Sequence, residues 1–164
     1  MADAVAFAGA TKAERYAELL PQLASLVDGE PDLIANLANL TAALRACLPV
    51  ASWVGFYVMR GGELVLGPFQ GNVACVRIAL GRGVCGTAAA ERRTLIVPDV
   101  EQFPGHIACD AGSRSEIVLP IVAGDARDRL VAVLDLDSYE LAAFDEVDAE
   151  WLGKVAALAA AFAW

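Results

Sequence analysis

Leucines recur at helical spacing between residues 31 and 48. The apolar stripe consists of Leu33, Leu37, Leu40 and Leu44, and this period predicts an amphipathic helix. Pro31 fits the first turn of that helix, and Pro49 is expected to end it. Cys47 continues the stripe, so we predict that it packs as a small buried hydrophobic group rather than acting as a reactive thiol.

A preceding helix is predicted over residues 11–29, TKAERYAELLPQLASLVDG. Thr11 followed by Glu14 has the spacing of a capping box, in which each side chain bonds to the other residue's backbone. Pro21 lies inside the segment and lacks the amide hydrogen that a helix interior uses. We therefore expect the helix to be kinked or divided at Pro21.

From residue 52 the pattern changes to short β-rich runs. These are SWVGFYVM (52–59), ELVLGPF (63–69) and VACVRIAL (73–80). Gly61-Gly62 and Gly71-Asn72 separate the runs, and such pairs favour tight turns. The pattern predicts three neighbouring strands joined by hairpin turns.

The remaining chain alternates between both kinds of pattern. We predict a short helix over VCGTAAAE (84–91), a brief strand TLIV (94–97), strands SEIVLPIV (115–122) and RLVAVLDLDS (129–138), and a closing helix over 145–163. A short charged turn, AGDARD (123–128), joins the last two strands. Acidic residues begin the closing helix, where the helix dipole favours negative charge.

One loop stands out by its length. Residues 98–114, PDVEQFPGHIACDAGSR, contain two prolines and no periodic pattern. Loops of this length within a compact domain are usually functional or disordered. Because Phe103, Ile107 and Cys109 lie in it, we interpret the loop as a lid over a binding cavity.

This order of elements predicts the fold class. Runs of strands flanked by helices, without strict alternation, favour an α+β fold with a mainly antiparallel central sheet. We expect residues 1–164 to form a single domain, with N-terminal helices at about 11–48, the sheet and its loops at about 52–138 and the C-terminal helix at about 145–163.

Composition excludes several classes of function. The chain of 164 residues is 57% hydrophobic, but much of this is alanine, and no apolar run has the length of a membrane span. The N-terminus has no secretory signal pattern, so we expect a cytoplasmic protein. The net charge of −9 argues against binding to nucleic acids or anionic membranes.

The other cysteines, Cys75, Cys85 and Cys109, lie close together in sequence. A reducing cytoplasm disfavours a permanent disulfide framework, so the placement of these cysteines indicates metal or redox chemistry. There is no C-x-x-C pair, and the isolated spacing of His106 and Cys109 is a weak zinc signal, so we predict no metal site. Thiol redox chemistry fits better, because the exposed loop of Cys109 suits a nucleophile and a second thiol could resolve it. Spacing alone leaves inert cysteines an equal alternative.

Carboxylates suggest where a substrate could bind. Asp135 and Asp137 share one face of a strand, because side chains alternate along a strand, and Glu116 begins the preceding strand. If the strands are neighbours, the three acids form a cluster that could bind an amino group or hold a proton. Solvated charges at strand ends are an equal alternative. Trp53 could supply an apolar wall, although core packing is the commoner role.

Several of these segments together resemble a known family. WVGFY, ELVLGPFQG, ACVRI, GRGVCGTAA, VPDV, FPGHIACD, SRSEIVLP and VLDLDS, followed by FDE, are similar in order and cysteine spacing to the free methionine-(R)-sulfoxide reductases. These are stand-alone GAF domains, and the similarity extends from about residue 11 to residue 155. The turn AGDARDRL is longer and more charged than the family pattern.

The resemblance implies a thiol-dependent reduction of free L-methionine (R)-S-oxide. Cys109 is implied as the nucleophile that becomes a sulfenic acid, Cys75 as the main resolving cysteine and Cys85 as a further disulfide partner in some members. Substrate would be held by Trp53, Glu116, Asp135 and Asp137. Thioredoxin is implied as the reductant, and no metal or organic cofactor is required.

The sequence leaves two other functions open. GAF domains also serve as non-catalytic sensors of small molecules, and a thiol protein could respond to peroxide without a specific substrate. Neither the oligomeric state, a homodimer included, nor the dominant resolving cysteine follows from the sequence.

Overall fold

A curled antiparallel sheet forms the centre of the molecule in the computed structural model, which describes residues 5–107, 109–124 and 129–164. Within these residues the strand order is β3-β2-β1-β6-β5-β4. The strands are β1 (Trp53–Arg60), β2 (Glu63–Gln70), β3 (Arg77–Ala79), β4 (Leu95–Val97), β5 (Ser115–Ala123) and β6 (Arg129–Ser138). The predicted α+β class with an antiparallel sheet is confirmed.

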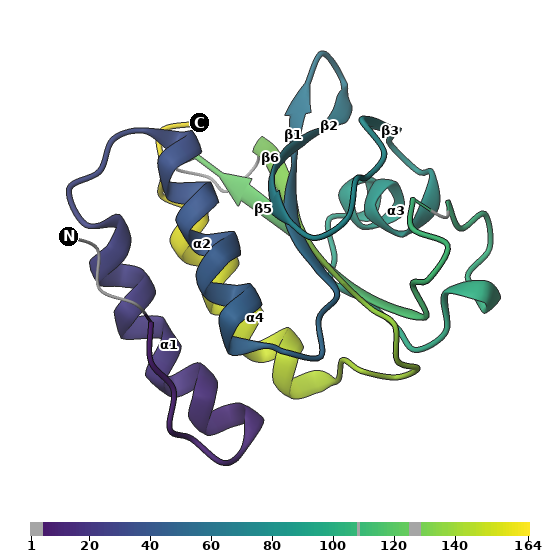
Figure 1. Ribbon diagram of the computed structural model, residues 1–164. Coiled ribbons are helices and arrows are strands. Elements are labelled where there is room, and N and C mark those ends of the chain that lie inside the picture. Colours follow the sequence, from purple (N-terminus) through teal and green to yellow (C-terminus); the bar gives the residue numbers. More distant parts are fainter. Residues whose placement is uncertain (1–4, 108, 125–128) are drawn as a thin grey trace.

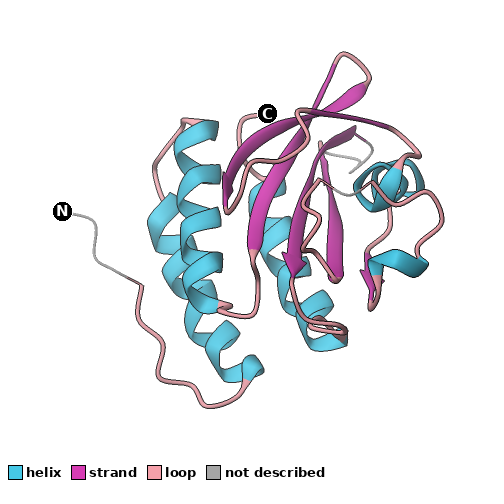
Figure 2. Cartoon of the chain, turned by 45° about the vertical axis from the view of Figure 1, so that its right-hand side comes forward, coloured by secondary structure: helices cyan, strands magenta, loops and turns pink. Residues whose placement is uncertain are grey.

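Helices cover the two faces of the sheet unequally. The helices are α1 (Lys12–Val27), α2 (Leu33–Cys47), α3 (Gly83–Glu91) and α4 (Glu146–Ala160), with a 3-10 turn η1 (Val100–Gln102). In Figure 1, α1, α2 and α4 lie on one side of the sheet, and α3 lies on the other. Figure 2 shows the same two layers from another side, with the long loops gathered near α3.

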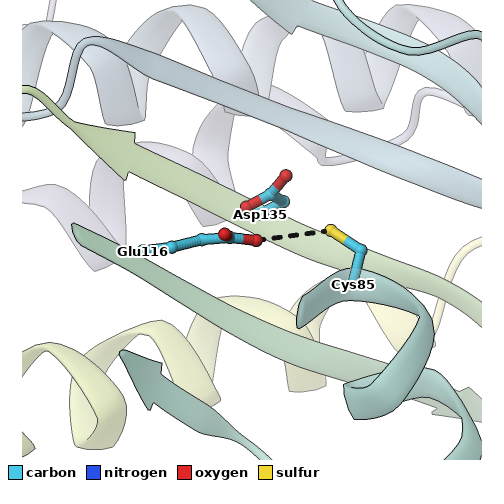
Figure 3. Close-up of side chains that lie close together, drawn as sticks. All are labelled: Cys85, Glu116 and Asp135. Atoms are coloured by element: carbon cyan, nitrogen blue, oxygen red, sulfur yellow. Dashed lines mark hydrogen bonds between the residues drawn. The ribbon is translucent and has the colours of Figure 1, made fainter. Parts of the chain in front are cut away.

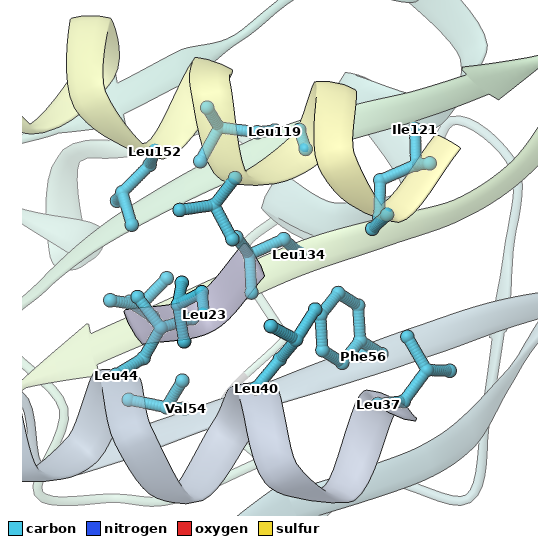
Figure 4. Packing of buried hydrophobic residues seen from close by; sticks show 14 of the residues in the cluster. Leu23, Leu37, Leu40, Leu44, Val54, Phe56, Leu119, Ile121, Leu134 and Leu152 are labelled. Carbon is cyan, nitrogen blue, oxygen red and sulfur yellow. The ribbon is translucent and has the colours of Figure 1, made fainter. Parts of the chain in front are cut away.

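The main core lies between the sheet and α1, α2 and α4. Alternate residues of β1, such as Val54 and Phe56, face this layer, as do Leu119 of β5 and Leu134 of β6 (Figure 4). Burying such side chains removes apolar surface from water, which is the main driving force of the fold. The intervening residues of the same strands therefore face α3.

The two N-terminal helices follow the sequence prediction, with one correction. Thr11 and Glu14 form the expected capping box of α1. Pro21 does not divide the helix, which runs unbroken to Val27. Pro21 has no amide hydrogen to donate to the carbonyl of Ala17, four residues earlier. Both residues are exposed, so water can donate to that carbonyl instead. Cys47 is buried at the end of α2, and burial raises its pKa to about 11.

The third β-rich run is mostly not a strand. Only Arg77–Ala79 form a strand paired with β2, so the prediction of a strand over 73–80 was wrong for Val73 to Val76 and for Leu80. Val73 and Val76 are exposed rather than packed on either face, with 87% and 65% of their surface accessible. β-Branched residues are typical of strands, which is why the pattern predicted one here, but these two valines do not extend the edge strand of the sheet.

The other predicted helices and strands are present, but residues 71–76, rather than a tight turn at Gly71-Asn72, connect β2 to β3. The Gly61-Gly62 turn joins β1 to β2, and both glycines have positive φ. Glu146 and Asp148 occupy the first turn of α4, which Asp145 caps. The turn at 123–128 falls largely outside the described residues. No helix in the described part of the chain is long and apolar enough to cross a membrane.

Candidate functional site

One row of side chains crosses three neighbouring strands on the α3 face. Trp53 of β1 pairs with Asp137 of β6, and Asp137 pairs with Glu116 of β5. Asp135 lies two residues from Asp137 on the same face, opposite Gly55. The acidic cluster was predicted on the condition that β5 and β6 are neighbours, and they are. Trp53, Glu116, Asp135 and Asp137 therefore lie close together.

These residues line a pocket between the sheet, α3 and the loops. The pocket opens to solvent. Residues 98–114 contribute His106, Ile107, Cys109, Asp110 and Ser113 to the lining. The long loop therefore borders a cavity, and its action as a lid stays a prediction.

Trp53 forms an apolar wall of this pocket. Its ring stacks with those of Tyr57 and Phe69, with ring centroids 5.9 and 5.3 Å away. The indole Nε1 donates to the carbonyl of Asn72 at 3.1 Å. Gly55 leaves room for the ring, because a Cβ there would overlap with the Trp53 side chain and with Phe69. Trp53 is therefore held in a defined orientation.

The three carboxyl groups have perturbed acidity. Burial, and then the charges of Asp135 and Asp137, raise the pKa of Glu116 well above its ordinary value. Burial and the charge of Asp137 do the same for the pKa of Asp135. The pKa of Asp137 is raised to about 7, mainly by burial. Close like charges cannot all ionise in a buried site, so at least one carboxyl stays protonated at neutral pH.

Cys85 is a buried thiol in the first turn of α3. Its Sγ donates to Oε1 of Glu116 at 3.8 Å, and Figure 3 shows the two groups pointing toward each other. Burial and the charges of Asp135 and Glu116 raise the pKa of this thiol well above its usual range. A neutral thiol is a weak nucleophile, so Cys85 is poorly suited to attack in this environment.

Cys75 and Cys109 form a disulfide at the mouth of the pocket, with Cα atoms 5.3 Å apart. Cys75 precedes β3, and Cys109 lies in the long loop, so two distant segments meet here. Cys109 contributes no zinc ligand in this form, because its sulfur is bonded to Cys75. His106 lines the pocket.

A polar cluster near the disulfide was not predicted. The hydroxyl of Tyr139 donates to Oδ2 of Asp110 at 2.8 Å, and Nδ2 of Asn72 donates to both groups at 3.1 and 3.0 Å. We call these three residues the clasp. The clasp joins the segment before β3 to the long loop and to the end of β6. Three isolated polar residues in three loops carry no periodic signal, so only their spatial meeting reveals them.

Known proteins resemble this chain over most of its length. Residues 37–162 match the family model described as a GAF domain. GAF domain-containing protein A of Dictyostelium discoideum is 51% identical over 94% of this chain and 96% of its own. The free methionine-R-sulfoxide reductase of Escherichia coli is 47% identical over 89% of this chain and 87% of its own.

A solved structure extends the likeness to three dimensions. It is that of free methionine-R-sulfoxide reductase from Neisseria meningitidis in complex with its substrate. The two chains are 49% identical, with a TM-score of 0.91, over 96% of this chain and 93% of the other.

Proposed function

The chain belongs to the free methionine-R-sulfoxide reductase family of GAF domains, and we propose on this basis that it reduces free L-methionine (R)-S-oxide to L-methionine. The observation that carries the proposal is the meeting of a cysteine pair, an apolar wall and a buried acidic cluster at one pocket. A sulfoxide with a methyl group, a polar oxygen and an ammonium group matches these three features.

The first step is attack by a thiolate on sulfur. We assign Cys109 as the nucleophile, with its thiolate at the pocket mouth once the disulfide is reduced. A carboxyl that is protonated at neutral pH, within the cluster of Glu116, Asp135 and Asp137, gives its proton to the sulfoxide oxygen. The hydroxyl then moves from the substrate sulfur to the Cys109 sulfur. A new S–O bond forms on Cys109 while the original S–O bond and the transient S–S bond break, so methionine leaves and Cys109 becomes a sulfenic acid.

The second step forms a disulfide. The thiol of Cys75 attacks the sulfenic sulfur, and the oxygen leaves as water. The disulfide between Cys75 and Cys109 supports Cys75 as the resolving residue, because the two sulfur atoms bond without either side chain crossing the pocket. In total, one sulfoxide and two thiols yield one sulfide, one disulfide and one water.

Thioredoxin then restores the two thiols by disulfide exchange. Cys75 and Cys109 are both partly exposed, which gives a reducing thiol access. Val73 and Val76, exposed beside Cys75, offer an apolar surface against which a reductase could pack. Such a cycle suits a reducing cytoplasm, where we place the protein.

Selection of the free amino acid follows from charge. The carboxyl groups of the cluster that are ionised attract the ammonium group of the substrate. No salt bridge between described residues involves Glu116, Asp135 or Asp137, so these acids have no basic side chain as a partner. A peptide-bound methionine sulfoxide has no ammonium group at this position. Trp53 packs against the methyl group of the substrate.

The deciding experiment couples the protein to thioredoxin, thioredoxin reductase and NADPH. NADPH consumption is expected with free L-methionine (R)-S-oxide and not with the S epimer. Cys109→Ser should also release no methionine in a single turnover, because a hydroxyl is a far weaker nucleophile than a thiolate. Cys47→Ala is the matched control and should behave as the wild type.

Binding without turnover would give a different answer. If the R epimer binds, for example by calorimetry, but neither single nor coupled turnover occurs, the chain is a GAF sensor rather than a reductase. If both epimers and hydrogen peroxide oxidise the thiols equally, the protein responds to oxidants without a specific substrate.

A further inference from the structure

Three potential metal-ligand atoms meet at the floor of the pocket. One atom each from Cys85, Glu116 and Asp135 lies within 4.8 Å of the other two, and all three residues are buried. Figure 3 shows their side chains gathered from α3, β5 and β6. This set is distinct from the cysteine pair at the pocket mouth, since Cys85 is free when Cys75 and Cys109 are bonded.

The cluster has an unused buried acceptor. Asp135 is 5% exposed, and its Oδ1 has no hydrogen-bond partner although it lies inside the protein. An unpaired buried carboxylate oxygen is costly, and such groups are normally hydrogen-bonded, paired with a charge or bound to a metal. The salt bridges of the described residues do not involve Asp135 or Glu116.

The ligand types indicate which ion would fit. Thiolate favours softer ions than Mg²⁺ or Ca²⁺, and one sulfur with two carboxylate oxygens suits Zn²⁺ in tetrahedral geometry. Zn–S and Zn–O bonds of about 2.3 and 2.1 Å place ligand atoms roughly 3.4–3.6 Å apart. The Cys85 Sγ and Glu116 Oε1 atoms are already 3.8 Å apart, so little movement is needed there.

We propose that Cys85, Glu116 and Asp135 bind a divalent ion of the zinc class, with the fourth coordination position open to the pocket. The thiol and any protonated carboxyl release their protons to solvent on binding, because the ligands coordinate in their deprotonated forms. The ion then occupies carboxylates to which the proposed function assigns the substrate, so metal and substrate compete. Metal binding itself does not depend on the reductase activity.

Cobalt provides a direct test in the oxidised protein. With the Cys75–Cys109 disulfide intact, Cys47 and Cys85 are the free thiols that the structure describes. Titration with Co²⁺ should give one bound ion per chain, a thiolate-to-cobalt charge-transfer band and the intense visible bands of tetrahedral cobalt. Zn²⁺ should displace the cobalt and remove these bands.

Substitutions assign the ligands. Cys85→Ser should abolish the charge-transfer band, while Cys47→Ala, which removes the other free thiol, should retain it. Glu116→Gln and Asp135→Asn should each weaken Co²⁺ binding at least ~10-fold, since loss of even an outer-shell partner commonly costs this much. Circular dichroism checks that each variant is folded, and the carboxylate variants keep the test decisive if Cys85→Ser does not fold.

Three results would overturn the proposal. These are a charge-transfer band that persists in Cys85→Ser, unchanged affinity in both carboxylate variants, or no spectral change in the wild type at millimolar Co²⁺. A further measurement tests competition for the site. Free L-methionine should raise the apparent dissociation constant for Co²⁺ more than the same concentration of L-alanine, which chelates the ion in solution through the same amino and carboxylate groups. The competition measurement rests on the proposed function, whereas the cobalt spectra do not. Failure of the metal site is therefore distinguishable from failure of the proposed function.

Discussion

Cys75 and Cys85 occupy different environments, although they lie only ten positions apart in the sequence. Cys75 is partly exposed and bonded to Cys109, whereas Cys85 is buried and donates to Glu116. The pKa of Cys85 is raised by burial and by two acids. Their chemistry therefore differs at the level of the single residue.

The first prediction separates these two thiols. Cys75→Ser should release about one methionine per chain and then stall with thioredoxin, because the sulfenic acid forms without its resolving partner. Cys85→Ser should keep forming the Cys75–Cys109 disulfide. Single-turnover release and coupled NADPH oxidation measure both steps. If Cys85→Ser stalls while Cys75→Ser cycles, the assigned roles are exchanged.

The second prediction concerns Glu116. Glu116→Gln preserves shape but removes a charge, and should lower kcat/KM for free methionine sulfoxide roughly tenfold or more, the scale of a lost charge-assisted hydrogen bond. N-acetylmethionine sulfoxide lacks the ammonium group and should be a poor substrate for the wild type. On it, the variant should lose little further activity.

Comparing the two substrates gives this prediction its control. Equal losses on the free and acetylated compounds would mean that Glu116 serves the sulfoxide step alone. No loss on either compound would contradict a functional role for the residue.

At the scale of elements, the clasp connects the segments that carry Cys75 and Cys109. Asp110 follows Cys109 directly, and Asn72 lies three residues before Cys75. Hydrogen bonds from the Gly112 amide, Tyr139 and Asn72 lower the pKa of Asp110, so its carboxylate is charged at neutral pH. Charge-assisted bonds of this kind hold both segments at the pocket mouth.

The third prediction follows from this connection. Tyr139→Phe removes the hydroxyl but keeps the ring, and should slow disulfide closure severalfold while leaving the preceding methionine release near the wild-type rate. Rapid-quench measurement of both steps tests it. If the clasp acts as a unit, the Tyr139→Phe/Asn72→Ala double variant should be no slower than the slower single variant. Closure at the wild-type rate in all three variants would contradict the prediction.

At the scale of the whole molecule, the buried acids make stability depend on pH. The pKa of Asp137 rises from its ordinary 3.8 to about 7 on folding. Between about pH 4 and pH 7 the folded state therefore holds a proton that the unfolded state has lost. Stability from this group is complete below pH 4 and is lost as the pH rises through 7.

The fourth prediction tests this linkage by thermal unfolding. Asp137→Asn cannot ionise, so its melting temperature relative to the wild type should increase between pH 5 and pH 8. A change on the order of 1 kcal/mol corresponds to about 2–4 °C for a domain of this size. A relative melting temperature that stays constant would show that Asp137 titrates normally.

Asp145 is the matched control for that experiment. It pairs with Lys12 at 2.9 Å, and chiefly this bond lowers its pKa. The stability contributed by a lowered pKa is present above the ordinary value and is lost only in acid. Asp145→Asn should therefore change the melting temperature by the same amount at pH 5 and at pH 8.

Local patterns in the sequence determined the elements and the faces of the strands. Thr11 with Glu14 marks the start of α1, and alternation along β6 sets Asp135 and Asp137 on one face, because caps and side-chain period depend on neighbours within a few residues. Where a local pattern failed, at Pro21 and at Val73 to Val76, the reason was exposure, which a pattern does not report. Family resemblance, rather than spacing, supplied the pairing of Cys75 with Cys109.

Only the tertiary structure decided which residues meet. The strand order sets Trp53, Asp137 and Glu116 in one row across β1, β6 and β5, and the docking of α3 brings Cys85 to Glu116. The clasp likewise unites Asn72, Asp110 and Tyr139 from separate loops. Such contacts join positions tens of residues apart, and local periodicity carries no information about them, because strand pairing and helix docking depend on the packing of the whole core.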